Sequence, residues 1–137
     1  MSAEKNAENG YRLPTEAERE YACRAGTMTE WSFGDNGQLL EQYGWYSYNS
    51  RGTTHAIGGK QPNPWGLYDM YGNVSEWCQN KLKSYAIESV DGERYGRALR
   101  GGAWCLDAHN ARSASRGHFQ VLGRRNFIGL RIIRETI

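Results

Sequence analysis

Three cysteines are the side chains of this chain best suited to nucleophilic or soft-metal chemistry: Cys23, Cys78 and Cys105. Thiol exchange, copper binding and zinc binding each need two or more thiolates close together, and their usual signature is Cys-x-x-Cys or similar spacing. Here the cysteines are odd in number and far apart in the sequence. We therefore expect free thiols in a reducing compartment, with one bridged pair as the less favoured alternative.

Two carboxylates, Asp69 and Glu76, lie seven residues apart in the segment Asp-Met-Tyr-Gly-Asn-Val-Ser-Glu. Calcium binds several oxygens, typically a mixture of carboxylates and backbone carbonyls. The alternative is that Asp69 caps a turn and Glu76 pairs with an arginine, with no metal bound. Both alternatives remain open from the spacing.

Arginine is concentrated toward the C-terminus, where nine arginines and no lysine follow residue 91. A basic patch for nucleic acid is one interpretation. We favour another, in which Arg112, Arg116 and Arg131 hold loops by donating hydrogen bonds to carbonyls. No lysine and no interleaved set of stacking aromatics accompanies them. We therefore expect no nucleic-acid partner.

The element that the sequence predicts most clearly is a helix following Pro14. Thr15 can cap its start, Glu18 completes a capping box, and Gly26 provides the stop. Several apolar side chains fall on one face, as in an amphipathic helix: Ala17, Tyr21, Ala22 and Ala25.

The rest of the chain predicts short strands and long ordered loops. The sequence has 17 Gly, 9 Tyr and 5 Trp, a set typical of a turn-rich fold held by buried rings. The expected segments are ordered loops over 31–59, a strand entered within 65–77, a solvent loop over 80–96, a strand over 97–104 with a bulge at Gly101-Gly102, no steady period over 105–127, and a closing strand over 127–133.

The bulk properties fit one α+β domain over residues 1–137, with residues 1–10 frayed. The chain is 39% hydrophobic and 23% charged with a net charge of +2, as in ordinary globular proteins. No apolar stretch reaches the roughly 18 residues that cross a bilayer, and the N-terminus lacks a signal peptide. We expect synthesis in the cytoplasm and no membrane insertion.

Several blocks, in order along the chain, resemble the formylglycine-generating-enzyme (sulfatase-modifying-factor) family. They are YRLPTEAEREYACRAGT, WYSYNSRGTTHAIGGKQPNPWGLYDMYGNVSEWC, RALRGGAW, RSASR and IGLRII. The resemblance implies a C-type-lectin-like fold with its termini near each other. Family domains usually carry a long part before the first block, where this chain has ten residues, and we interpret the chain as a shortened domain rather than a fragment.

The resemblance also locates the family's catalytic cysteine pair, and the pair is missing. The two positions, five and ten residues after Gly101, are Leu106 and Ala111. Cys105 lies one residue before the first and has no partner thiol. We therefore expect no enzyme and no copper. A formylglycine-generating-type oxidase is the alternative.

In the family, the segment that matches residues 69–76 binds calcium through two side chains and two carbonyls. The resemblance carries this ligand set to Asp69, Gly72, Val74 and Glu76, for calcium in a structural role.

A subset of the family comprises variable proteins of diversity-generating retroelements, in which scattered Asn codons become NNY codons, a set that excludes Gln. This chain is most like that subset, which implies a diversified surface for a protein or cell-surface ligand, displayed by a virus or a prokaryotic host. An ordinary lectin-fold interaction domain is the alternative. Gln120 is outside the NNY set. The framework includes Gly101, Gly102 and Gly129, expected in special conformations or close contacts, and a core Trp104. The expected ligand-binding residues are Cys105, Leu106, Asp107, His109, Ala111, Ser115, Gly117, His118, Phe119, Gln120, Leu122, Gly123, Arg125 and Phe127.

Overall fold

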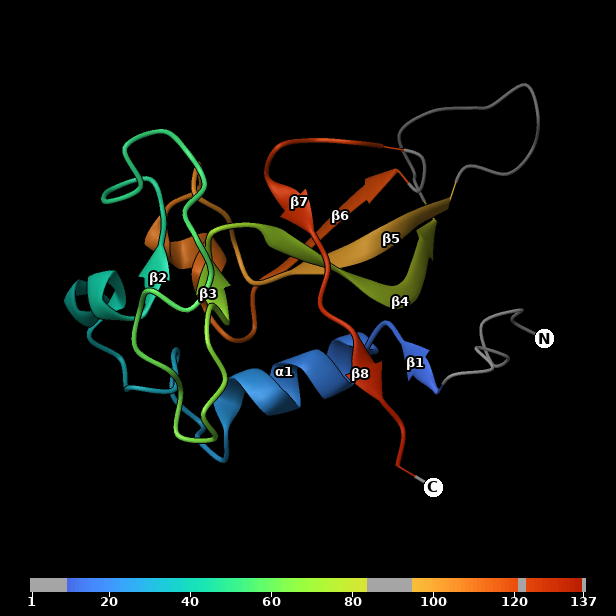
Figure 1. The fold of residues 1–137 in the computed structure, drawn as a ribbon, viewed down its shortest axis with the longest axis horizontal. Helices are drawn as coiled ribbons and strands as arrows, with labels where there is room; N and C mark the ends of the chain where they lie inside the picture. The colour runs from blue at the N-terminus through green and yellow to red at the C-terminus, as the bar shows by residue number, and fades with distance from the viewer. Residues whose placement is uncertain (1–9, 84–94, 121–122, 137) are drawn as a thin grey trace.

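A four-stranded sheet with one helix against it forms the centre of the fold (Figure 1). The structure is a computed structural model that describes residues 10–83, 95–120 and 123–136. The strand order is β6-β5-β4-β7, with β4 antiparallel to β5, β5 antiparallel to β6, and β4 parallel to β7. The strands are β4 (Ser75–Lys83), β5 (Tyr95–Arg100), β6 (Arg116–Gln120) and β7 (Ile128–Gly129).

The predicted helix is confirmed as α1 (Glu16–Arg24). Both hydrogen bonds of the capping box form: the Glu18 amide donates to the Thr15 hydroxyl, and the Thr15 amide donates to the Glu18 carboxylate. Ala25, in the left-handed region with φ of 48°, ends the helix before Gly26.

The face by which α1 packs differs in part from the expected one. Ala25 is buried and Ala22 packs against the apolar core, as expected. Ala17 is exposed and Tyr21 is 69% exposed, whereas Glu16, Arg19 and Cys23 are buried. Spacing of three and four residues places these buried side chains on one face. The helix therefore presents charged side chains to the sheet, where residues of opposite charge lie on β4 and β5.

The first buried ion pair joins Arg19 to Glu76 of β4, with 3.0 Å between Arg19 Nε and Glu76 Oε2 and at most 6% exposure of either side chain. Arg131 donates to the same carboxylate at 2.9 Å. Burial raises the pKa of Glu76, but the two guanidinium groups outweigh it and hold the pKa below its ordinary value.

The second cluster centres on Glu16. Arg100 Nε and Arg116 Nε each donate to its Oε1 at 2.9 Å, and Arg116 Nη2 donates to its Oε2 at 2.7 Å. The hydrogen bonds from Arg116 lower the pKa of Glu16, against the opposite effect of burial. Arg100 also reaches Glu20 at 2.8 Å. These bonds join α1 to β5 and β6.

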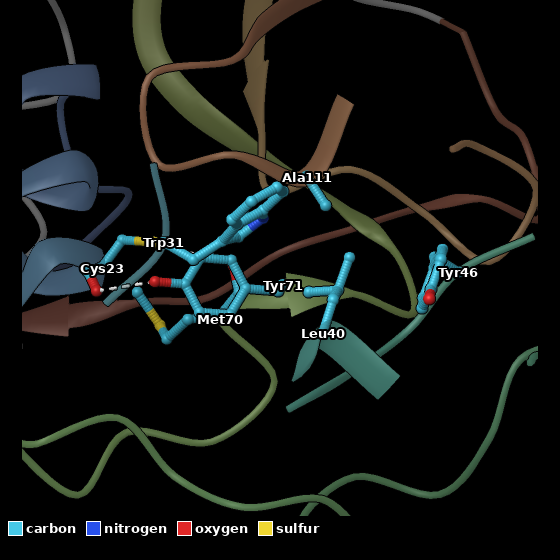
Figure 2. Packing of buried hydrophobic residues seen from close by; sticks show 7 residues of the cluster. All are labelled: Cys23, Trp31, Leu40, Tyr46, Met70, Tyr71 and Ala111. Atoms are coloured by element: carbon cyan, nitrogen blue, oxygen red, sulfur yellow. Dashed lines mark hydrogen bonds between the residues drawn. The ribbon is translucent and has the colours of Figure 1, made fainter. Parts of the chain in front are cut away.

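An apolar cluster lies beside this ionic layer, toward the short parallel pair β2 (Gly44–Trp45) and β3 (Tyr71–Gly72) (Figure 2). Tyr71 is its centre: its hydroxyl accepts from the Ser32 amide at 2.7 Å and donates to the Cys23 carbonyl at 3.3 Å. Burial raises the pKa of Tyr71 to about 12. The cluster consists of Cys23, Trp31, Leu40, Tyr46, Met70, Tyr71 and Ala111.

The two ends of the described chain lie side by side, as expected. β1 (Tyr11–Arg12) and β8 (Ile133–Arg134) pair antiparallel, and the Glu135 amide donates to the Gly10 carbonyl at 2.9 Å. The fraying predicted for residues 1–10 concerns residues 1–9, which lie outside the described part, and Gly10, which is held by this bond.

Several strand boundaries correct the sequence-based expectations. The loop predicted over 80–96 is wrong at both ends, since β4 runs to Lys83 and β5 begins at Tyr95; residues 84–94 lie outside the described part. β5 ends before the glycine pair 101–102, and the register irregularity lies between Trp77 and Lys81 of β4.

The last third also differs from its expected pattern. The stretch 105–127 contains β6 and one short 3-10 helix, η3 (Ala108–Ala111). The closing strand divides into β7 and β8, which lie in separate sheets. Trp104 is half-buried, with its indole N–H donating to the Asn126 carbonyl at 3.2 Å, so it is not the core residue that was expected. A second 3-10 helix, η2 (Gly37–Gln42), precedes β2.

The three cysteines are free thiols, as predicted. Cys23 and Cys78 are buried and Cys105 is exposed. Burial raises the pKa of Cys78 to about 11. In the part of the chain that the structure describes, no helix combines the length and apolar character that a membrane span requires.

Acid is expected to destabilise the protein through its paired carboxylates. Hydrogen bonds from Arg12 lower the pKa of Glu18 to about 2. The pKa values of Glu16 and Glu76 are also lower than the ordinary value for glutamate. Because an unfolded glutamate has a pKa of about 4.3, the unfolded chain binds protons more readily. The free energy of unfolding, measured by urea denaturation, should therefore fall as the pH drops from about 5 toward 2.

A matched pair of variants separates the buried cluster from surface effects. Glu16→Gln should weaken the pH dependence and cost about 3–5 kcal/mol, since it removes the buried charge partner of Arg100 and leaves that guanidinium only the partly exposed Glu20. Glu135→Gln removes an exposed partner of Arg12 and should cost about 0.5 kcal/mol or less. Equal losses for both would contradict the role given to Glu16.

Candidate functional site

A cavity of about 160 Å³ opens beside β5 and β6, among the residues expected to bind a ligand. Gly101 and Gly102 line it next to the end of β5, and Arg100 and Arg116 contribute charge. The cavity brings together six of the predicted ligand-binding residues: Leu106, Ser115, Gly117, His118, Phe119 and Phe127.

Strand pairing explains how the cavity floor is built. Leu99 of β5 pairs with Gly117 of β6, and Arg97 pairs with Phe119, so these four positions share one face of the sheet. A Cβ added at Gly117 would meet only Leu99, at an ordinary 3.7 Å. The missing side chain at Gly117 therefore leaves room beside Leu99.

The glycine pair beside the floor is held in place by contacts that exclude a side chain. Gly101 and Gly102 have φ of 104° and 73°, and a Cβ on them would lie 2.6 Å from Arg19 Nη2 and 3.0 Å from Ala111 Cα, respectively. A Cβ on Gly129 would lie 2.8 Å from Val74 Cγ2. These framework predictions are confirmed.

Two phenylalanines line the cavity with a cation beside one of them. Phe119 and Phe127 meet edge to face with ring centroids 6.2 Å apart. The Arg125 guanidinium lies 5.0 Å from the Phe119 centroid. Arg116, with its side chain 59% exposed, adds a second positive charge.

Three uncharged polar side chains of the lining already form hydrogen bonds inside the protein, whereas the exposed imidazole of His118 forms none in the described part of the chain. The hydroxyl of Ser75 donates to the Gly102 carbonyl at 2.8 Å, and that of Ser115 donates to the His109 carbonyl at 2.6 Å. Asn110 Nδ2 donates to Asp107 at 2.8 Å. The cavity therefore offers mainly apolar contact within and charge from its arginines.

The remaining predicted residues lie around the cavity or away from it. Cys105, His109, Gln120 and Arg125 are exposed without lining the cavity. Asp107 is exposed and caps η3. A Cβ at Gly123 would lie 2.1 Å from Phe119 Cε1, so packing limits this position. Leu122 lies outside the described residues.

Ala111 is a wrong prediction. It is 1% exposed, belongs to the apolar cluster and contacts the Gly102 backbone, so it cannot present a side chain to a ligand. The predicted site also omitted seven residues that line the cavity: Ser75, Leu99, Arg100, Gly101, Gly102, Asn110 and Arg116. Of these, the two glycines were expected only as framework, and Leu99 carried a signal only as an apolar position in a predicted strand.

The two positions that match the family's catalytic cysteines differ in burial. Leu106 lines the cavity, whereas Ala111 is buried beneath it. Cys105 is not among the lining residues, and neither are Cys23 and Cys78. The described cavity wall therefore presents no thiol.

The four predicted calcium ligands lie along one turn and the start of β4. Asp69 fits a cation in part: it is 7% exposed, and its Oδ1 has no hydrogen-bond partner. Glu76 does not, because Arg19 and Arg131 already occupy both of its oxygens. No group of three or more His, Cys, Asp or Glu suited to a metal occurs among residues 10–83, 95–120 and 123–136. Calcium binding stays a prediction.

The arginines expected to hold loops behave in two ways. Arg112 Nε donates to the His109 carbonyl at 2.9 Å, and Arg131 Nη2 donates to the Tyr68 carbonyl at 2.8 Å, as predicted. Arg116 instead pairs with the Glu16 carboxylate.

Comparison with known proteins identifies the family to which this arrangement belongs. Residues 2–136 match the family model for the sulfatase-modifying factor enzyme 1-like domain. The chain belongs to this family. Among solved structures, variable protein 1 of Treponema denticola is similar, with a TM-score of 0.80 and 37% identity over 90% of this chain and 47% of that chain. The fold is α+β and C-type-lectin-like, as expected.

The curated relatives include a protein named as a chaperone and a protein named as an enzyme. The chaperone protein LppX of Paenibacillus barcinonensis is 32% identical over 93% of this chain and 50% of its own length. The formylglycine-generating enzyme of Mycobacterium tuberculosis is 42% identical over 53% of this chain and 28% of its own length. The chain thus spans half or less of the length of these two relatives.

The calcium prediction can be tested by thermal melting in calcium and in chelator. Binding to the folded state alone stabilises it by RT ln(1 + [L]/Kd), so a site that uses Asp69 requires a lower melting temperature in chelator. Asp69→Ala should abolish the difference. Identical melting temperatures across a wide range of calcium concentration would mean that the arginine pairs of Glu76 have closed the site.

Proposed function

We propose that this chain is a non-enzymatic binding domain that displays a diversified surface around the cavity on a sulfatase-modifying-factor scaffold. The carrying observation is that six of the residues predicted from sequence to vary line one cavity. Their backbone is held by the glycine pair 101–102 and by the β5–β6 pairing. A rigid framework with replaceable side chains in one concave patch is how displayed binding sites work.

The expected ligand is a protein or a cell-surface molecule, and the likeness to a variable protein of Treponema denticola supports this choice. An ordinary interaction domain of the same fold would share the scaffold without the variation. The nucleotide sequence around the gene distinguishes the two: a near-repeat of the segment for residues 105–127 with a reverse-transcriptase gene nearby supports diversification.

A formylglycine-generating activity is the second candidate, favoured by the identity to the Mycobacterium tuberculosis enzyme. The positions of the catalytic pair hold Leu106 and Ala111, which supply no thiolate for copper or thiol exchange. Cys105 alone, exposed and outside the cavity lining, offers no second thiol.

We expect no aldehyde when the protein is incubated with copper and a peptide containing Cys-x-Pro-x-Arg, followed by mass spectrometry. The relative from Mycobacterium tuberculosis serves as the positive control. Turnover that Cys105→Ser abolishes would overturn the non-enzymatic assignment.

The binding surface should tolerate substitutions that its framework rejects. A library randomised at Cys105, His118, Gln120 and Arg125, all exposed, should fold in most members, with changes of about 0.5 kcal/mol each. A control library at Gly101, Gly102 and Gly129 should mostly fail, since each site needs positive φ or meets a close contact. Sorting first for folding and then for ligand binding measures both. Failure of the first library to fold would refute the display surface.

A further inference from the structure

We propose that the cavity accepts one aromatic or large aliphatic side chain from a protein ligand, and that the residues flanking this anchor in the ligand are acidic. This proposal rests on the proposed binding function and specifies its partner. It follows from the size of the cavity, the chemistry of its lining and the unpaired charge beside it.

The size of the cavity matches a single anchor. A cavity of about 150 Å³ lined by Leu, Ile and Phe can hold a benzene molecule, and this one measures about 160 Å³. It is therefore too small for a segment of chain and large enough for one ring. Buried aromatic and aliphatic anchors in such pockets dominate many protein interfaces.

The lining selects an apolar side chain. Leu99, Leu106, Phe119 and Phe127 provide the apolar wall. The hydroxyls of Ser75 and Ser115 are engaged by carbonyls of the protein itself, as described above, and Asn110 is engaged by Asp107. Apart from the exposed His118 and the arginines, the lining offers a polar anchor no free partner in exchange for the water it loses, which is unfavourable.

The charge around the cavity selects acidic flanks. Residues 105–127 contain four arginines, two histidines and one acid, Asp107. Arg116 uses Nε and Nη2 on Glu16 and remains 59% exposed. Arg124 and Arg125 are exposed and form no salt bridge with any carboxylate in the described part of the chain. Complementary charge steers and orients association.

A nucleic acid could also bind the positive charge of these arginines, but the arrangement of the Phe119 and Phe127 rings favours a protein ligand. Binding of single strands relies on exposed rings on which successive bases stack. Phe119 and Phe127 meet edge to face at 88° and are half-buried, so they form no such platform. We therefore expect the exposed arginines to bind carboxylates of a protein ligand.

The test uses a phage-displayed library of random disulfide-cyclised peptides selected on the full chain. Enriched peptides should share one Phe, Trp, Leu or Met with Asp or Glu beside it. Affinities of the enriched peptides are then measured by calorimetry at two salt concentrations. They should weaken at the higher concentration, because the arginine–carboxylate contacts are screened.

Two variants test the anchor and the flanks separately. Gly117→Leu fills the cavity from a strand position that admits a side chain, and binding of enriched peptides should fall at least tenfold. Gly59→Leu is its control, because Gly59 is exposed, lacks positive φ and lies outside the cavity. Arg124→Gln with Arg125→Gln should weaken binding about 2- to 10-fold, as expected for two exposed ion pairs; Arg51→Gln, also exposed, is the control for charge.

The outcomes separate this proposal from the proposed function. Enriched peptides that are basic or lack an apolar anchor, or that bind Gly117→Leu unchanged, overturn the anchor and leave the binding domain intact. A short single-stranded DNA or RNA that binds as tightly as the peptides overturns the protein ligand. Selection that enriches no peptide, combined with a randomised library in which no folded member binds any ligand, overturns both. Circular dichroism melting confirms that each variant is folded.

Discussion

The packing of α1 on the sheet depends on charges that are buried and paired. Arg19 reaches across to Glu76 on β4, and Glu16 reaches Arg100 and Arg116 on β5 and β6. Desolvation of such ions costs nearly as much as their attraction returns, so the net gain in stability is small. The cost of separating them is large, however, because each would remain buried without a counter-charge. The ionic layer therefore fixes where the helix lies more than how stable it is.

These buried ion pairs extend to the residues that line the cavity, because Arg19 lies against Gly101. The Arg19 guanidinium fills the space beside Gly101 and donates to the Met70 carbonyl at 2.8 Å, so it sets the path of the chain that leaves β5. That chain leads through Gly102, which rests on Ala111, into the loops expected to contact a ligand. The position of the cavity is thus determined by a helix residue far from it in sequence.

Local signals in the sequence predicted the local features well. The capping box at Thr15 and Glu18, the special glycines and the free cysteines depend on neighbouring residues or on residue type, and the structure contains them. The resemblance to the family supplied the fold, which no periodicity would have indicated. It also located the patch that contains the cavity, although it could not exclude Ala111.

The errors come from long-range contacts. Ala17 and Tyr21 of α1 were expected to pack, but Glu16 and Arg19 are buried in their place because their partners, Arg100 and Glu76, are supplied by strands far along the chain. β6 was missed since Arg-Gly-His-Phe-Gln lacks the alternation of a half-buried strand, and pairing with β5 alone defines it. For Glu76 the spacing left a metal and an arginine pair both open, and the structure contains pairs with arginines from two other segments.

Arg116 has a consequence for how such a surface could evolve. It lines the cavity, yet its guanidinium also completes the coordination of Glu16 beneath the sheet. A mutational process that rewrote every position of residues 105–127 would therefore sacrifice the scaffold along with the old specificity. Under the proposed diversification, the fold can be inherited only if the rewriting leaves such positions unchanged, so every variant would keep Arg116 among its new side chains.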